Sequence, residues 1–206
     1  GIPSVTMTAG IVSIVEDGGT LTLIVNMSLA SGVDTTVDFT TSGTATQDKD
    51  YSTTPDPLII PSGTKQGTVT VKSINDQIDD DAETVIIAVG AGSISNSIGA
   101  TNNIQDVTLT ISDDDTAGFS LSKQEAAVSE SGSTDTFTVV LESEPTHDVI
   151  FTLTSDDTEE STVSPDNLTF TPKDWNTAQT VTITGVADDK DDENATSKIT
   201  VSVNSS

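Results

Sequence analysis

The chain has 206 residues, which is enough for one large domain or two ordinary ones. It carries 33 acidic and 7 basic residues, a formal net charge of −26, which excludes nucleic-acid binding through phosphate neutralisation and disfavours anionic membrane surfaces. The absence of cysteine excludes disulfides, thiolate metal sites and cysteine nucleophiles. We therefore expect cations or basic surfaces as partners.

High charge with few aromatic residues favours disorder, which is the first alternative to a folded chain. The apolar residues contradict it, because they alternate within short runs and are not evenly diluted. No run approaches the ~18 apolar residues of a membrane span, so we expect no membrane insertion. The chain begins at Gly1 without a signal peptide, and we expect it to be a piece of a longer protein.

Period-two alternation of aliphatic with polar residues, mainly threonine and serine, predicts β-strands along the whole chain. The clearest runs, in chain order, are 68–73, 107–112, 137–142 and 180–184. Turns rich in Gly, Pro, Asp and Ser separate them, and no segment has the period of a helix. The pattern predicts an all-β chain of antiparallel sandwiches.

Acidic residues concentrate in the turns of the first half and are sparse on the strand faces. Acids that end strands suit a hard cation, since calcium takes roughly six to eight oxygen ligands. Without a cation, such anions crowded at one end of a domain would repel one another. The acidic turn segments are 15–19, 48–51, 75–76, 79–83 and 113–115.

The second half of the chain repeats the first. The turn Glu16–Thr20 recurs loosely as Glu130–Thr134, and Leu58–Pro61 recurs as Leu168–Pro172. We therefore predict two tandem sandwich domains, with their boundary at Asp115–Gly118. The predicted domains are 1–116 and 117–206.

The second domain is expected to lack its last strand. In the first domain a strand over 106–112 precedes the acidic triplet 113–115, whereas in the second the strand over 196–203 is followed only by residues 204–206. An unpaired sheet edge is expected there. Either the piece stops before this strand, or the next module or a neighbouring chain supplies it.

Five motifs in the first half occur in an order and at spacings that resemble the Calx-beta domain family, which is found in sodium–calcium exchangers and in many bacterial surface proteins. The resemblance covers roughly residues 5–118, and residues 117–206 resemble a divergent member. The motifs are Val15–Thr20, Gly43–Tyr51, Ile59–Gly63, Ile74–Glu83 and Ile111–Gly118.

The resemblance implies a calcium cluster at one end of a seven-stranded, immunoglobulin-like sandwich with Greek-key connections. Asn75 stands where the family often has an acid, which implies fewer ions or weaker binding there. The residues that match the family's metal ligands are Glu16, Asp50, Asp76, Asp80, Glu83, Asp113, Asp114 and Asp115.

The second domain keeps part of this acidic pattern. Glu130 matches the first acid, and Asp156 and Asp157 could replace the Asp-Tyr turn. Without a closing triplet we do not expect a complete calcium cluster there. Its remaining acidic loop consists of Asp188, Asp189, Asp191, Asp192 and Glu193.

We expect a non-enzymatic calcium-binding module of a large cell-surface or secreted, bacterial adhesin-like protein. Calcium ions would stiffen the acidic loops and the hinge between domains, and the partners would be neighbouring repeat modules and a protein or glycan ligand. Two alternatives stay open: a calcium-dependent carbohydrate- or peptide-recognition module, and an acidic spacer without specific calcium binding. One histidine, no cysteine and no Gly-x-Ser-x-Gly turn give catalysis little support.

Overall fold

The computed structural model describes residues 1–10, 12–90, 92–95, 100–187 and 193–204, and these form two units. Unit 1 comprises residues 1–76 and 80–114, and unit 2 comprises 77–79 and 115–206. The described residues contain no helix long and apolar enough to cross a membrane. That residues 117–206 are a divergent copy of the first domain remains a prediction.

Unit 1 consists of β-strands whose alternating residues bury one face, as the sequence pattern predicts. Several are short, since turns interrupt the pairing, so the described part of unit 1 has more strands than the seven expected. They are β1 (Ser4–Ala9), β2 (Ser13–Val15), β3 (Thr20–Met27), β4 (Thr35–Val37), β5 (Thr40–Gly43), β6 (Tyr51–Thr54), β7 (Leu58–Ile60), β8 (Gln66–Ser73), β9 (Glu83–Ala88), β10 (Ile94–Ser95), β11 (Thr101–Asn102) and β12 (Val107–Ser112).

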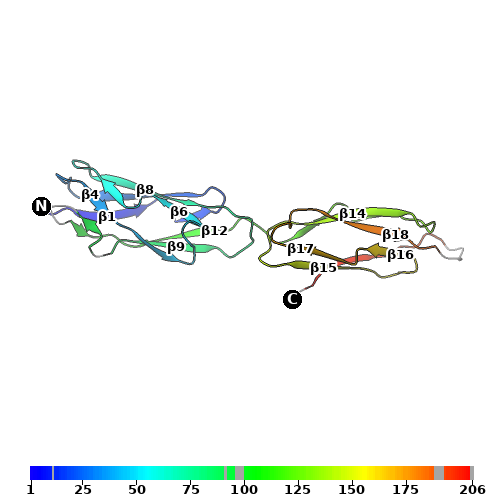
Figure 1. The fold of residues 1–206 in the computed structure, drawn as a ribbon. Helices are drawn as coiled ribbons and strands as arrows, with labels where there is room; N and C mark the ends of the chain where they lie inside the picture. Colours follow the sequence, from blue (N-terminus) through cyan, green and yellow to red (C-terminus); the bar gives the residue numbers. More distant parts are fainter. Residues whose placement is uncertain (11, 91, 96–99, 188–192, 205–206) are drawn as a thin grey trace. The chain divides into compact units, whose positions relative to one another are not determined.

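The strands of unit 1 form three hydrogen-bonded groups in the orders β11-β1-β3-β8-β6, β2-β12-β9-β5 and β10-β4-β7. Figure 1 shows them in two layers. Most neighbours are antiparallel, but β2 runs parallel to β12 and β1 parallel to β11. The core lies between the layers and includes Leu21, Leu23, Val71 and Leu109, all 0 % exposed.

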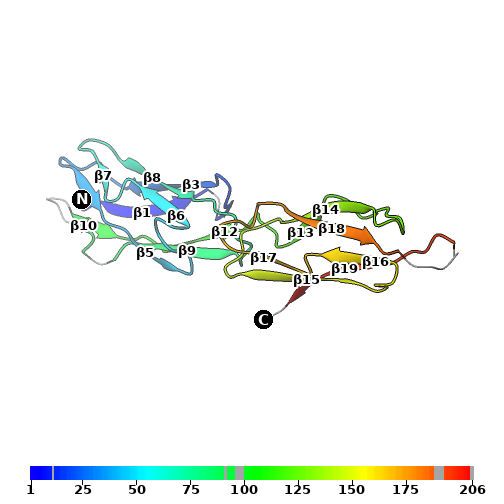
Figure 2. The same ribbon diagram turned by 45° about the vertical axis from the view of Figure 1, so that its right-hand side comes forward.

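Unit 2 has the strands β13 (Phe119–Leu121), β14 (Thr134–Leu141), β15 (Val149–Ser155), β16 (Ser161–Ser164), β17 (Asn167–Phe170), β18 (Gln179–Gly185) and β19 (Ile199–Asn204). They form two sheets, β13-β14-β18-β16 and β17-β15-β19. Figure 2 shows β14 and β18 in one layer and β15 and β19 in the other. Phe151, Phe170 and Trp175 fill the core between the sheets.

The all-β prediction is confirmed. The alternating residues expected to face inward are buried, among them Val69 and Val71 in unit 1 and Val139 and Val181 in unit 2. Among the described residues of unit 2, β19 is the last strand.

Candidate metal centre

Two strand registers bring the acidic turns of unit 1 to the same end of its sandwich. In the parallel ladder Val15 is opposite Ser112, and the Glu16 amide donates to the Ser112 carbonyl over 2.9 Å. Glu16 and Asp113 therefore leave their strands side by side. In the antiparallel ladder of β9 and β12, Glu83 is opposite Ile111, which brings the first residue of β9 to the same end.

A third register adds Asp50 and Asp76. Tyr51 pairs with Ser73, and the Ile74 amide donates to the Asp50 carbonyl over 2.9 Å. The residues that precede β6 and follow β8 therefore lie next to one another. All of the predicted ligands thus lie at or just beyond strand ends and not on strand faces.

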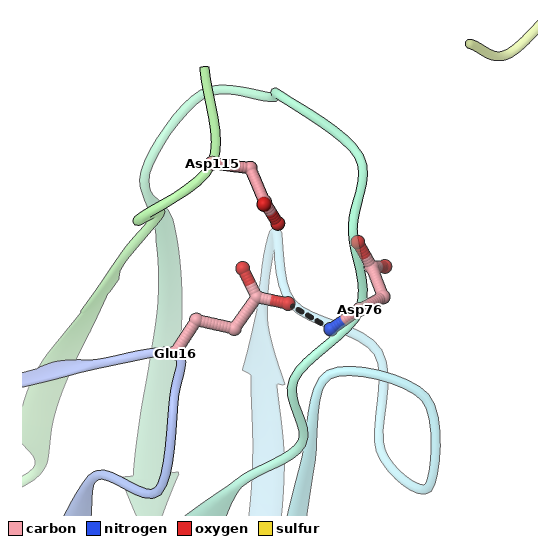
Figure 3. Close-up of side chains that lie close together, drawn as sticks. All are labelled: Glu16, Asp76 and Asp115. Carbon is pink, nitrogen blue, oxygen red and sulfur yellow. Dashed lines mark hydrogen bonds between the residues drawn. The ribbon is translucent and has the colours of Figure 1, made fainter. Parts of the chain in front are cut away.

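The carboxylates of Glu16, Asp76 and Asp115 form the tightest acidic group. Each offers one oxygen, and these oxygens all lie within 4.8 Å of one another. Figure 3 shows the side chains converging, with the Asp76 amide donating to Glu16 Oε1 over 2.8 Å. Glu16 and Asp76 are only partly exposed, and Asp115 Oδ2 is buried. Three anionic oxygens this close are suited to a divalent cation.

The turn between β2 and β3, which carries Glu16, is fixed by a buried serine. Ser73 is 3 % exposed, and its hydroxyl lies 2.9 Å from the Val15 carbonyl and 3.1 Å from the Gly19 carbonyl. A Cβ on Gly19 would lie 2.1 Å from the Val15 carbonyl oxygen, so only glycine fits this turn. These residues position Glu16 without being ligands.

Asp50 and Glu83 form a second group of neighbouring acids. Asp50 is 9 % exposed; its Oδ2 accepts a hydrogen bond from the Thr46 amide over 2.6 Å, and Lys49 Nζ lies 3.4 Å from Oδ1. Burial, the charge of Asp50 and a hydrogen bond between the two side chains raise the pKa of Glu83. Glu83 therefore holds a proton more readily than an ordinary glutamate.

The remaining predicted ligands lie at the edge of the group. The Asp80 amide donates to Asp113 Oδ2 over 3.3 Å, and the Asp17 amide donates to Asp114 Oδ1 over 3.2 Å. Asp114 is exposed, whereas Asp113 is partly buried. The side-chain amide of Asn75 donates to the Asp76 carbonyl over 2.8 Å, which fixes its orientation.

Several acids of unit 1 lie close enough for the charge of each to affect the pKa of its neighbours. Burial raises the pKa of Glu16 to about 7, with smaller contributions from the charges of Asp76, Asp113 and Asp80 and an opposing one from the Asp76 amide. Desolvation and the charges of Asp113 and Asp76 raise the pKa of Asp80. A bound cation would favour the ionised form of these carboxylates and compete with their protons.

The sequence identified the acidic residues but not the residues that hold them in position. The structure brings Glu16, Asp76 and Asp115 together, joins Asp50 with Glu83 and Asp80 with Asp113, and leaves Asp114 on the exposed side. Ser73 was missed; its signal is a polar residue at an inward position of an alternating strand. Residues 188–192, with most of the second domain's acidic loop, lie outside the described residues.

Comparison with known proteins gives one family match. The model described as Calx-beta domain matches residues 2–115, more than half of the chain. No curated protein matches.

Three solved structures illustrate the similarities. The structure titled CBD12 from CALX1.2 is 18 % identical, covers 96 % of this chain and 80 % of that one, and has a TM-score of 0.43. The apo-form Calx CBD1 domain is 20 % identical over 54 % of this chain and 99 % of that one, with a TM-score of 0.41. The structure of S-layer protein SbsC domains 4 and 5 is 16 % identical, covers 100 % of this chain and 95 % of that one, and has a TM-score of 0.36.

Proposed function

The chain belongs to the Calx-beta domain family of non-catalytic calcium-binding modules, and we propose that it binds calcium through the clustered carboxylates of the predicted first domain, residues 1–116. The ligands we propose are the eight acids that match the family pattern. Their oxygens are hard donors, which calcium prefers over nitrogen or sulfur ligands.

The spacing of Glu16, Asp76 and Asp115 carries the proposal. Calcium binds oxygen at about 2.3–2.6 Å, so two oxygens on one ion can be at most about 5 Å apart. The three oxygens lie within 4.8 Å of one another and meet this limit. Small rotations of side chains would bring all three onto one ion.

The other acids support more than one ion. Asp50 with Glu83, and Asp80 with Asp113, lie beside the three-acid group and contribute to its electrostatic field. Because one oxygen from each of three carboxylates would supply about half of calcium's roughly six to eight oxygen ligands, neighbouring acids, backbone carbonyls and water would complete the shell. Shared carboxylates would then connect adjacent ions.

Calcium would stiffen the loops that carry these acids. In its absence the anions repel, and a proton on Glu16 relieves part of the repulsion. A cation replaces the proton and ties the ends of β2, β8, β9 and β12 together. Since Asp115 lies next to the predicted domain boundary, the same ions would also restrain the predicted hinge between the two domains.

We place the module in a large cell-surface or secreted, bacterial adhesin-like protein, where neighbouring modules and a protein or glycan would be its macromolecular partners. The cysteine-free, Thr/Ser-rich and strongly acidic composition supports this setting. A series of calcium-stiffened modules would act as an extended stalk. Calcium sites in extracellular modules bind with Kd values of about 10⁻⁴–10⁻³ M.

Thermal unfolding in chelator, in millimolar calcium and in millimolar magnesium tests the proposal. A ligand at 100 times its Kd stabilises the folded state by about 2.7 kcal/mol. We expect calcium to raise the melting temperature and magnesium to have little effect. Asp76→Asn should remove most of the rise, whereas Asp106→Asn, which changes an exposed acid immediately before β12, should retain it. No shift with calcium would leave an acidic spacer as the better account.

A further inference from the structure

The turn between β2 and β3 contains the pair Asp17–Gly18, and no other aspartate and no asparagine in the sequence is followed by glycine. An aspartate in front of a glycine can react with its own main chain, because glycine lacks the Cβ that would keep its nitrogen away from the aspartate side chain. A β-branched residue in the same place crowds this approach. Whether the pair reacts in the folded chain depends on how the turn holds it.

The fold leaves both residues of this pair uncovered. Asp17 and Gly18 are exposed, and apart from its chain neighbours a Cβ on Gly18 would meet no atom within 4 Å. Gly19 is enclosed by contrast, since its Cβ would lie 2.1 Å from the Val15 carbonyl oxygen. Water and the Asp17 side chain therefore have access to the Gly18 nitrogen, while the residues on either side hold the turn in place.

Neither reacting group is engaged elsewhere in the part of the chain that the structure describes. Within that part, the Asp17 carboxylate has no hydrogen bond or ion pair, and the Gly18 amide donates to no acceptor. Asp17 is held through its own main-chain amide, which donates to Asp114 Oδ1 over 3.2 Å. Gly18 has a φ of 71°, in the left-handed region that favours glycine, so the turn itself requires the reactive residue.

We propose that Asp17 converts spontaneously to isoaspartate in the folded chain. The Gly18 nitrogen bonds to Cγ of the Asp17 carboxyl group, and the hydroxyl of that group leaves with the amide hydrogen as water. Water then opens the resulting cyclic succinimide. Cleavage of the bond from nitrogen to Cγ restores aspartate, whereas cleavage of the bond from nitrogen to the main-chain carbonyl carbon gives isoaspartate, with no net change in mass.

The product would lengthen a turn whose ends are fixed. In isoaspartate the main chain runs through Cβ and Cγ, which adds a methylene group between Glu16 and Gly18. The Ser73 hydroxyl lies 2.9 Å from the Val15 carbonyl and 3.1 Å from the Gly19 carbonyl, and so it bridges the two sides of the modified pair. A longer turn would strain or break this bridge and displace Glu16, which lies within it.

The reaction needs water but no cation, enzyme or oxidant, so the proposal does not depend on calcium binding by unit 1. Asp106 provides an internal comparison, because it is exposed as well but is followed by the β-branched Val107. Two exposed aspartates with different successors separate the effect of glycine from that of solvent access.

Mass spectrometry of proteolytic peptides tests the proposal on the full 206-residue chain. After several weeks in neutral buffer at body temperature, fragmentation by electron transfer should detect isoaspartate at position 17 and only background at position 106. A synthetic peptide of residues 13–21 gives the rate of the same pair without the fold, and we expect the folded chain to react at a similar rate. Modification at Asp17 no greater than at Asp106 would overturn the proposal, and a reacting peptide would then show that the fold protects the pair.

Two matched variants locate the reaction. Asp17→Glu keeps the charge but requires a larger ring, so the isoaspartate content of the aged chain should fall to background. Asp106→Glu should leave it unchanged. Methyl transfer by a protein-isoaspartate methyltransferase measures the total in both variants. An isoaspartate content in Asp17→Glu as high as in the unaltered chain would place the reaction elsewhere and contradict the proposal.

The stability of the modified chain tests the structural consequence. Chains with isoaspartate at position 17, separated from unmodified chains by ion exchange, should unfold at a lower urea concentration because the Ser73 bridge is strained or lost. Equal urea midpoints would show that the turn accommodates the added methylene group, and would contradict the proposed displacement of Glu16.

Discussion

Glu16 has the most strongly raised carboxyl pKa of the described acidic end of unit 1. It is partly buried, accepts the Asp76 amide, and lies in the field of Asp76, Asp80 and Asp113. Its pKa of about 7 means that a proton occupies this carboxylate in much of the calcium-free protein at neutral pH. The proton partly replaces the positive charge that a calcium ion would supply.

The pH dependence of stability follows from this pKa. Glu16 titrates at about 7 when folded and near 4.5 when unfolded, so the folded state holds a proton that the unfolded state releases between these values. The calcium-free chain should lose stability as pH rises from about 5 to about 8, and Glu16→Gln should flatten this slope. Chelator-treated samples melted across the range measure it. An equally steep slope in the variant would contradict the assignment to Glu16.

Two other shifted acids do not disturb that test. Hydrogen bonds from Lys123 and from backbone amides lower the pKa of Asp135. Hydrogen bonds from the backbone amide and the hydroxyl of Thr171 lower the pKa of Asp174. Asp135 and Asp174 therefore stabilise the folded state at pH values above 3.8, the pKa of an unfolded aspartate. This stabilisation is lost only as the pH falls below that value. In the presence of calcium the pH dependence of stability should reverse, because the ion binds the ionised form of Glu16 and competes with its proton.

At the scale of elements, the turn from β2 to β3 determines where Glu16 lies. Gly19→Ala would place a Cβ 2.1 Å from the Val15 carbonyl oxygen, so the turn must shift. We expect a loss of about 1–3 kcal/mol in unfolding free energy and weaker calcium binding. Gly10→Ala is the control, since its Cβ meets nothing within 4 Å. Urea unfolding of both variants measures the difference, and equal stabilities would show that the turn adapts.

Element prediction from sequence succeeded where alternation was long and failed where pairing was short. The runs 68–73 and 137–142 bury the alternate residues that the period indicated. The strands β10 and β11 have only two residues each, and the parallel pairing of β2 with β12 depends on a distant partner. Local patterns do not contain such long-range pairing.

The candidate site shows the same limit. The order of acidic motifs indicated which residues to consider, since each follows or precedes a strand. It did not give the pairing of Asp50 with Glu83 or the role of Ser73, because both depend on the registers of β6, β8, β9 and β12. Which three acids lie closest together also depends on the positions of their side chains, which the sequence does not give.

At the scale of the whole molecule, the two units have separate hydrophobic cores, and most of the predicted calcium ligands belong to unit 1. Trp175, the one tryptophan, is 8 % exposed in the core of unit 2, so its fluorescence reports the unfolding of that unit. We expect calcium to raise the calorimetric transition of unit 1 and to leave the Trp175 transition nearly unchanged. An equal shift in both would show that calcium stabilises unit 2 as well.

Direct calcium titration of the metal-free chain by isothermal calorimetry tests the central claim. We expect saturable binding, with loss of the tightest site in Asp76→Asn and retention of it in Asp106→Asn. Because Glu16 releases a proton when calcium binds, the measured heat should also depend on the ionisation enthalpy of the buffer. Absence of saturable heat at millimolar calcium, or identical curves for the two variants, would contradict a calcium site at the end of unit 1.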